Sequence, residues 1–137
     1  MLRKAEAALP QTLVILDLND FSLFIPNMDW KNLTSIDQLE AIASDSFNTP
    51  QVLFKHSTRC SISSMALNRL ESSTAPMGVD FYLLDLLQHR DISAAIAEKF
   101  KVHHESPQAL VIMNGECTYD ESHMGISMDE IAEQTAQ

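Results

Sequence analysis

The sequence has little of the material that several common classes of protein require. Its 137 residues include two cysteines and three glycines. Two cysteines cannot form the disulfide framework on which small secreted domains depend, and so low a cysteine content is typical of a reducing compartment. The few glycines form neither a glycine-rich phosphate loop nor a Gly-x-Ser-x-Gly motif, so the sequence matches neither of these catalytic templates.

Long apolar runs and positive charges are also scarce. The apolar run at residues 13–16 is interrupted by Asp17 and Asp20. A secretory signal needs about 7–15 apolar residues, and a transmembrane helix needs about 20. The chain carries 19 Asp and Glu against 9 Lys and Arg, a net charge of −10. This charge argues against nucleic acid or an anionic membrane as a partner, and we expect a cytoplasmic protein.

The composition that remains is that of one globular domain, with 45% hydrophobic and 20% charged residues. Residues 1–27 stand apart, because Pro26-Asn27 interrupts the chain and the later residues read as a complete domain. We therefore expect an N-terminal extension at 1–27 and a domain at 28–137. One hypothesis makes Met28 the physiological start; the alternative is that the extension is an extra edge strand or arm.

The apolar pattern of the domain alternates between helical and strand spacing. Capping-box patterns at Ser35 and Ser127 open two expected helices, and Asp91 or Ser93 is expected to cap another. Asn114-Gly115 predicts a tight hairpin. The expected helices lie at about 36–46, at 61–73, up to Phe100 and from 128 onward; the expected strands lie at about 52–56, 79–85, 109–113 and 116–120. A βαβ unit followed by a hairpin predicts an α/β fold with a mixed sheet flanked by helices.

Cys60 is the residue most suited to chemistry. It follows an expected strand and a short polar turn, at the place where the next helix begins. The unpaired N–H groups and the positive dipole of a helix N-terminus stabilise a thiolate, which is the reactive form. We expect Thr58 or Ser57 to cap this helix and the neighbouring Arg59 to support the thiolate further. The alternative is a buried, inert cysteine.

The run Cys60-Ser61-Ile62-Ser63 has serine where a dithiol enzyme has its second cysteine. Cys60 must therefore rely on an external thiol to resolve a mixed disulfide. Ser63 lies about one helical turn further on, where its hydroxyl either bonds the thiolate or serves as an ordinary helix serine. Ala66 replaces the arginine that a cysteine-phosphatase loop needs.

We expect Cys117 and the five histidines to have structural rather than chemical roles. Cys117 follows the Asn-Gly turn and is expected to be a small packed side chain rather than a resolving thiol. No histidine pairs with another ligand at zinc-binding spacing, so no metal is assigned. His56 precedes Cys60 by four residues and is expected to be a half-buried strand residue, although tuning of the thiolate is an alternative.

Over residues 30–131 the chain resembles the monothiol bacilliredoxins, thioredoxin-like proteins of bacteria that use bacillithiol. Ser61 departs from the proline that often follows the cysteine in this family; proline there would preorganise the helix. The motifs that carry the resemblance are Trp30, Leu33-Thr34-Ser35, the run Phe54 to Ser63 with its Lys-His-Ser-Thr-x-Cys pattern, Asp85 with His89-Arg90-Asp91, and His104-Glu105-Ser106-Pro107-Gln108.

The resemblance implies a thioredoxin-like fold and a redox role. It places a cis bond between Ser106 and Pro107, with the Ser106 backbone presented to an extended substrate. Cys60 would remove bacillithiol, or a similar low-molecular-weight thiol, from mixed disulfides on client proteins. The thiol is a co-substrate, so no bound cofactor is expected, and the protein is expected to be a monomer or weak dimer.

Two other functional hypotheses are also consistent with the sequence. The Arg59-Cys60-Ser61 run also occurs in arsenate-reductase-like proteins of this fold, although oxyanion binding wants several arginines and the helix offers only Arg69. A non-catalytic redox sensor or adaptor needs the same accessible cysteine. Iron–sulfur binding is a more remote option.

Overall fold

The computed structural model describes residues 28–136 as one α/β unit. Its elements in chain order are β1 (Trp30–Asn32), α2 (Asp37–Asp45), β2 (Gln51–His56), α3 (Ser61–Glu71), β3 (Asp80–Asp85), α4 (Arg90–Phe100), β4 (Gln108–Met113), β5 (Glu116–Ser122), the short 3-10 helix η4 (His123–Gly125) and α5 (Met128–Thr135). Within this part of the chain, no helix is both long enough and apolar enough to span a membrane.

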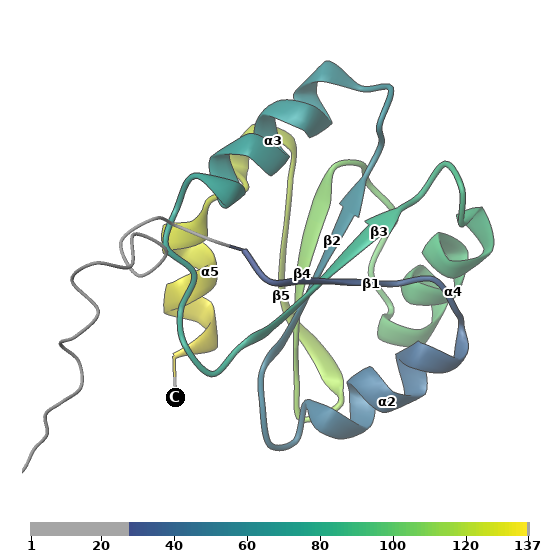
Figure 1. Ribbon diagram of the computed structural model, residues 1–137. Coiled ribbons are helices and arrows are strands. Elements are labelled where there is room, and N and C mark those ends of the chain that lie inside the picture. Colours follow the sequence, from purple (N-terminus) through teal and green to yellow (C-terminus); the bar gives the residue numbers. More distant parts are fainter. Residues whose placement is uncertain (1–27, 137) are drawn as a thin grey trace, which may run out of the picture.

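The five strands form one mixed sheet in the order β1-β3-β2-β4-β5, which crosses the centre of Figure 1. β2 runs parallel to β3 and antiparallel to β4, with His56 opposite Asp85 and Lys55 opposite Gln108. The carboxyl ends of β2 and β3 and the start of β4 therefore meet at one end of the sheet. The loops that leave this end carry the expected site residues.

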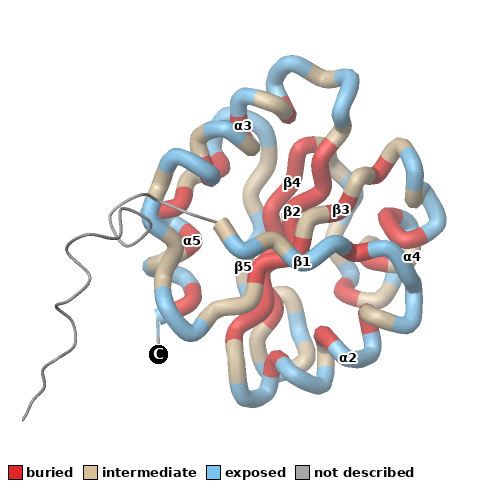
Figure 2. The backbone as a smooth tube through the Cα atoms, viewed as in Figure 1, coloured by how far each residue is buried: buried red, intermediate tan, exposed pale blue. Residues whose placement is uncertain are grey.

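Helices cover both faces of the sheet. In Figure 1, α3 and α5 lie to the left of the strands, and α2 and α4 lie to the right. Alternate residues of each central strand point to opposite faces, so Leu53 joins the α2–α4 core while Val52 and Phe54 join the α3–α5 core. All six residues of β2 are buried, and Figure 2 shows buried backbone concentrated in the central strands.

The structure confirms several local features that the sequence predicts, at two helix starts and one hairpin turn. Ser127 Oγ accepts a hydrogen bond from the Glu130 N–H at the start of α5. Ser35 N–H donates to Gln38 Oε1 before α2, as in a capping box. At the Asn114-Gly115 turn, φ is 54° and 81°, which fits a two-residue hairpin with two left-handed positions.

The sequence prediction was wrong at the starts of α3 and α4. The N-cap of α3 is Cys60 itself, and that of α4 is His89; neither makes a side-chain capping hydrogen bond. Thr58, Ser57, Asp91 and Ser93 therefore do not cap these helices. Helix α3 begins later in the chain than Ser57 or Thr58 would require, and α4 begins earlier than Asp91 or Ser93 would require.

The prediction also missed β1, whose three residues are too few to produce an alternating pattern. It missed η4 as well, which follows β5 directly. The expected extension at residues 1–27 lies outside the described residues.

Candidate functional site

Cys60 stands where strand β2 gives way to helix α3. It has an extended backbone (φ −106°, ψ 121°) and is partly exposed, so the alternative of a fully buried cysteine does not apply. Its carbonyl accepts the Ser64 N–H at 3.0 Å, which closes the first turn of α3. Since no side chain caps this helix, the N–H groups of its first turn remain available near the sulfur. Ser61 keeps a backbone N–H that proline would lack.

Ser63 fixes the turn that carries Cys60. Its buried Oγ accepts the Ser57 N–H at 2.9 Å and lies 2.6 Å from His56 Nδ1. The serine oxygen has two acceptor sites and one proton, so the donor in the contact with His56 depends on the histidine tautomer. Burial lowers the pKa of His56 and favours its neutral form. The Ser63 hydroxyl therefore bonds to Ser57 and His56 rather than to the Cys60 sulfur.

The loop before β4 contains the cis Ser106–Pro107 bond, which confirms that expectation. Register places Pro107 just beyond Gln108, at the end of the sheet where β2 leads to Cys60. The Pro107 carbonyl accepts the His123 N–H at 3.1 Å. Ser106 makes no backbone–backbone hydrogen bond within residues 28–136, and its buried Oγ has no partner there. The Ser106 backbone is thus free to pair with an extended chain.

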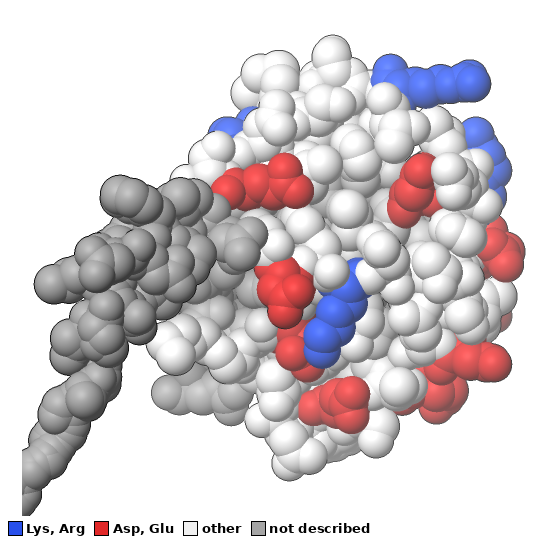
Figure 3. All heavy atoms as spheres, in the orientation of Figure 1, with Lys and Arg blue, Asp and Glu red and all other residues white. Residues whose placement is uncertain are grey.

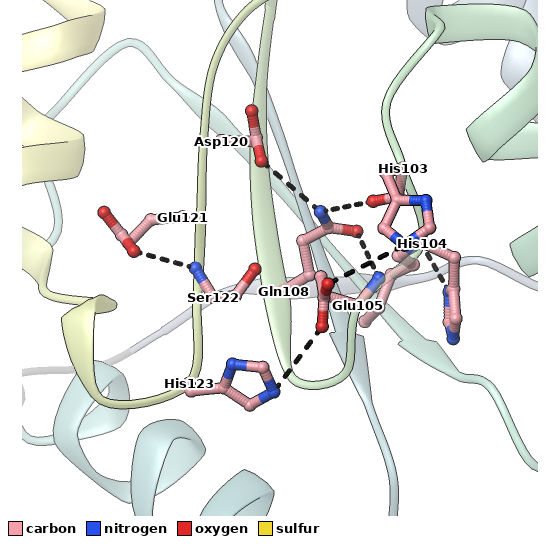
Figure 4. A network of polar contacts seen from close by, with 9 residues as sticks. His103, His104, Glu105, Gln108, Asp120, Glu121, Ser122 and His123 are labelled. Carbon is pink, nitrogen blue, oxygen red and sulfur yellow. Dashed lines mark hydrogen bonds and ion pairs between the residues drawn. The ribbon is translucent and has the colours of Figure 1, made fainter.

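Polar side chains anchor this loop to the sheet. Gln108 is fully buried; its amide donates to the His103 carbonyl at 3.0 Å and to Asp120 Oδ2 at 3.4 Å. Figure 4 shows the Glu105 carboxylate between the loop and η4, facing His123. Glu105 oxygens lie 3.8 Å from His123 Nε2 and 3.9 Å from His103 Nε2. These contacts hold the cis-proline loop in register with β5.

A buried cation lies beneath the same end of the sheet. Lys55 has no exposed surface, and its Nζ lies 3.0 Å from His104 Nδ1. Burial lowers the pKa of Lys55 to about 8. Ser93 Oγ lies 3.2 Å from the same His104 nitrogen. The ammonium only donates, so His104 Nδ1 accepts and its proton sits on Nε2; burial and Lys55 lower the pKa of His104 accordingly.

The remaining predicted residues lie beside the Cys60 loop and in β5. Thr58 and Arg59 are exposed and line a pocket of about 350 Å³ beside the Cys60 loop. Cys117 Sγ donates to the Tyr119 carbonyl at 3.3 Å and packs against the α2–α4 core. Burial raises the pKa of the Cys117 thiol to about 11, so it is protonated at neutral pH.

Residues 28–136 contain no group of three or more His, Cys, Asp and Glu side chains arranged to hold a metal ion. The site therefore consists of one partly exposed thiol, a helix N-terminus with free N–H groups and a cis-proline loop with an unpaired backbone. This arrangement suits attack of a thiolate on a disulfide held beside the loop.

Sequence reasoning did not assign roles to Lys55, Gln108 or Arg90. One signal was available for the first two, because a lysine and a glutamine within apolar strands are buried polar groups that need partners. Arg90 gave no such signal, since an arginine at the start of a helix is usually a solvated surface residue.

Comparison with known proteins gives a consistent picture. The family model of the monothiol bacilliredoxin BrxC matches residues 31–131. A solved structure with a thioredoxin fold shares 32% identity and a TM-score of 0.67, and the match covers 85% of this chain and 98% of that one. Thioredoxins are similar in fold alone. That of Malassezia sympodialis shares 17% identity and a TM-score of 0.59, covering 82% of this chain and 96% of its own.

The thioredoxin of Fasciola hepatica adds a further example, with 16% identity and a TM-score of 0.57 over 77% of this chain and 95% of that chain. These matches confirm the expected thioredoxin-like fold.

Proposed function

The chain belongs to the monothiol bacilliredoxin family, and from this premise we propose that it removes bacillithiol, or a similar low-molecular-weight thiol, from mixed disulfides on client proteins. Membership of this family and the thioredoxin fold support a thiol redox role. The single observation that carries the proposal is the partly exposed Cys60 at the N-cap of α3. Ser63 stands where a second cysteine would be, so the chemistry uses one thiol.

The proposed reaction has two exchange steps. The Cys60 thiolate attacks the bacillithiol sulfur of the client's disulfide, forming a new S–S bond while the client leaves as a thiolate. A second low-molecular-weight thiolate then attacks the bacillithiol sulfur carried by Cys60. This step releases a low-molecular-weight disulfide and restores the Cys60 thiolate. Electrons balance because the second thiol is the reductant and each step exchanges one S–S bond for another.

Different residues of the site have different roles in the proposed reaction. The free N–H groups of the first turn of α3, including that of Ser61, favour the negative sulfur in both steps. The unpaired Ser106 backbone offers hydrogen bonds to the client segment beside its disulfide. Ser63 and His56 hold the turn so that the sulfur stays at the helix end. We place the reaction in the cytoplasm, since the low cysteine content suits a reducing compartment.

A release assay tests the proposal. A client protein carrying S-bacillithiol is incubated with the purified protein and excess thiol, and the freed client is measured by mass spectrometry. Cys60→Ala should abolish release above the background of the thiol alone. Cys117→Ala is the matched control and should release at the wild-type rate. Undiminished release by Cys60→Ala would contradict the assignment.

Turnover separates an exchanger from a sensor. A sensor or adaptor reacts once per molecule, whereas the proposed protein releases many client molecules per Cys60. For arsenate reduction, Arg69 of α3 is not available to an oxyanion, because its guanidinium donates to the Ile126 carbonyl at 2.9 Å. Assay of arsenate reduction by the purified protein discriminates that alternative directly.

A further inference from the structure

The Lys and Arg side chains of the described residues fall into two groups. Four of them have partners: Lys31 with Asp80, Lys99 with Glu40, Lys55 with His104 and Arg69 with the Ile126 carbonyl. For Arg59, Arg90 and Lys101, no ion pair or side-chain hydrogen bond occurs within residues 28–136. In a chain of net charge −10, cations left without a partner are candidates for ligand binding.

Arg90 lines two pockets, one with Arg59 and one with Lys101. Arg59 and Arg90 line the pocket of about 350 Å³ beside the Cys60 loop. Arg90 and Lys101 line a neighbouring pocket of about 650 Å³ along α4. Figure 3 shows Lys and Arg side chains at the upper right, where Figure 1 places the β2–α3 and β3–α4 loops, and others at the centre and the upper left of the same face.

The smaller pocket is built by the two loops at the carboxyl ends of β2 and β3. These strands are paired up to His56 and Asp85, and the Leu86 N–H donates to the His56 carbonyl at 3.0 Å, so the loops lie side by side. Thr58, which lines the pocket, precedes Cys60 by only two residues. A small molecule bonded through sulfur to Cys60 therefore has this pocket within reach.

We propose that the Arg59–Arg90 pocket binds the carboxylate groups of the low-molecular-weight thiol, and so selects anionic thiols for exchange at Cys60. Guanidinium groups bind carboxylates through paired, charge-assisted hydrogen bonds. Asp85 also lines the pocket; one of its oxygens accepts the Leu87 N–H at 3.2 Å, and the other is an acceptor for an ammonium or hydroxyl of the same ligand. This inference rests on the proposed exchange function and names its substrate class.

A small thiol fits this pocket better than a client segment does. The volume is that of a small-molecule site, and the cis-proline loop already offers an unpaired backbone to an extended chain. The two substrates would then approach Cys60 from different loops: the client beside Ser106 and the body of the thiol between Arg59 and Arg90.

The test measures selectivity rather than rate alone. Reduced protein is mixed with bacillithiol disulfide or oxidised glutathione, which are anionic, and with 2-hydroxyethyl disulfide, which is neutral. The rate of Cys60 modification is followed by mass spectrometry for wild type, Arg59→Gln, Arg90→Gln and the double variant. Lys99→Gln is the matched control, since it removes one positive charge from α4 outside the pocket.

For each single variant, the ratio of the anionic to the neutral rate should fall about fivefold, and for the double variant more than tenfold. Because the ratio divides out any general loss of thiolate reactivity, it isolates binding from the support that Arg59 is expected to give Cys60. The control should keep the wild-type ratio, and added salt should reduce the wild-type preference.

The outcomes separate the two proposals. Exchange at Cys60 with an unchanged ratio in the double variant would overturn the pocket and leave the exchange function standing. A fall of the same size in Lys99→Gln would also overturn it, because net charge alone would then explain the preference. Absence of exchange with every disulfide would overturn the function and this inference together.

Discussion

The two cysteines lie in different environments, Cys60 at the start of a helix and Cys117 within a strand of the sheet. Cys60 follows the short turn after the central strand β2 and is the N-cap of α3, and its side chain is partly exposed. Cys117 lies within β5, donates to the Tyr119 carbonyl and packs on the α2–α4 core. Both are free thiols with intermediate burial. The difference shows that position at the end of a strand, rather than exposure alone, distinguishes a candidate nucleophile from a packing residue.

The largest expected contrast between the two sites is their rate of alkylation. Burial raises the pKa of Cys117 to about 11, which leaves it at least about a hundredfold less thiolate at pH 7 than an ordinary cysteine has. Iodoacetamide at pH 7 should therefore modify Cys60 at least as fast as free cysteine, and Cys117 about a hundredfold more slowly. Peptide mapping of both sites over time measures the two rates.

The Cys117→Ser variant provides the control for that experiment, since its Cys60 rate should match that of the wild type. Equal rates at the two cysteines would remove the contrast. A Cys60 rate below that of free cysteine would contradict the activated thiol.

A second contrast lies on the α2–α4 face of the sheet, which holds the buried Lys55 near the end of β2 and is apolar where Cys117 packs. Lys55 has a pKa lowered from 10.5 to about 8 by burial, so between these pH values the unfolded chain binds more protons and stability rises with pH. Lys55→Met removes the buried charge and should raise the free energy of unfolding at pH 7 by about 1–3 kcal/mol. The advantage should shrink as pH approaches 10.5.

Urea unfolding of both proteins at several pH values measures this difference. Lys99→Met removes a partly exposed lysine of α4, and its difference from wild type should not change with pH over the same window. A constant advantage of Lys55→Met from pH 7 to pH 10.5 would show that Lys55 keeps its ordinary pKa.

A third contrast compares the hydroxyl groups that support the two regions. Ser63→Ala leaves the Ser57 N–H and the buried His56 Nδ1 without their partner, which should cost about 1–3 kcal/mol of unfolding free energy. Thr118→Ala, next to Cys117, removes one long hydrogen bond of 3.5 Å from an exposed side chain and should cost about 0.5 kcal/mol or less. Urea unfolding at pH 7 measures both. Equal costs would mean that the Cys60 turn is no more constrained than an ordinary strand position.

The main architecture follows from the sequence because its signals are long and periodic. The apolar runs gave β2, β3 and β4 to within one residue, and the Asn114-Gly115 turn gave the hairpin. β1 escaped prediction because it has three residues, of which Lys31 and Asn32 are exposed. Short edge strands are defined by their pairing with a neighbour, and that pairing exists only in the folded chain.

The site was predictable only in part for a related reason. Cys60 and Pro107 could be found from local patterns and the family resemblance. The partner of Ser63 could not, since Cys60 lies one helical turn before it while His56 lies in β2, and only the packing of α3 on β2 brings His56 into contact. The convergence of Arg59 and Arg90 was also hidden, because the two residues meet through the parallel pairing of β2 with β3.

The edges of the sheet have a consequence for how these molecules behave at high concentration. A long, flat edge strand invites pairing with another chain, which leads to aggregation. Within the described residues, one edge is β1, with only three residues, and the other is β5, where Glu116, Asp120 and Glu121 place carboxylates along the strand. The carboxylates of β5 should therefore repel another copy, and β1 is too short to template pairing, so crowding favours separate molecules over edge-to-edge pairs.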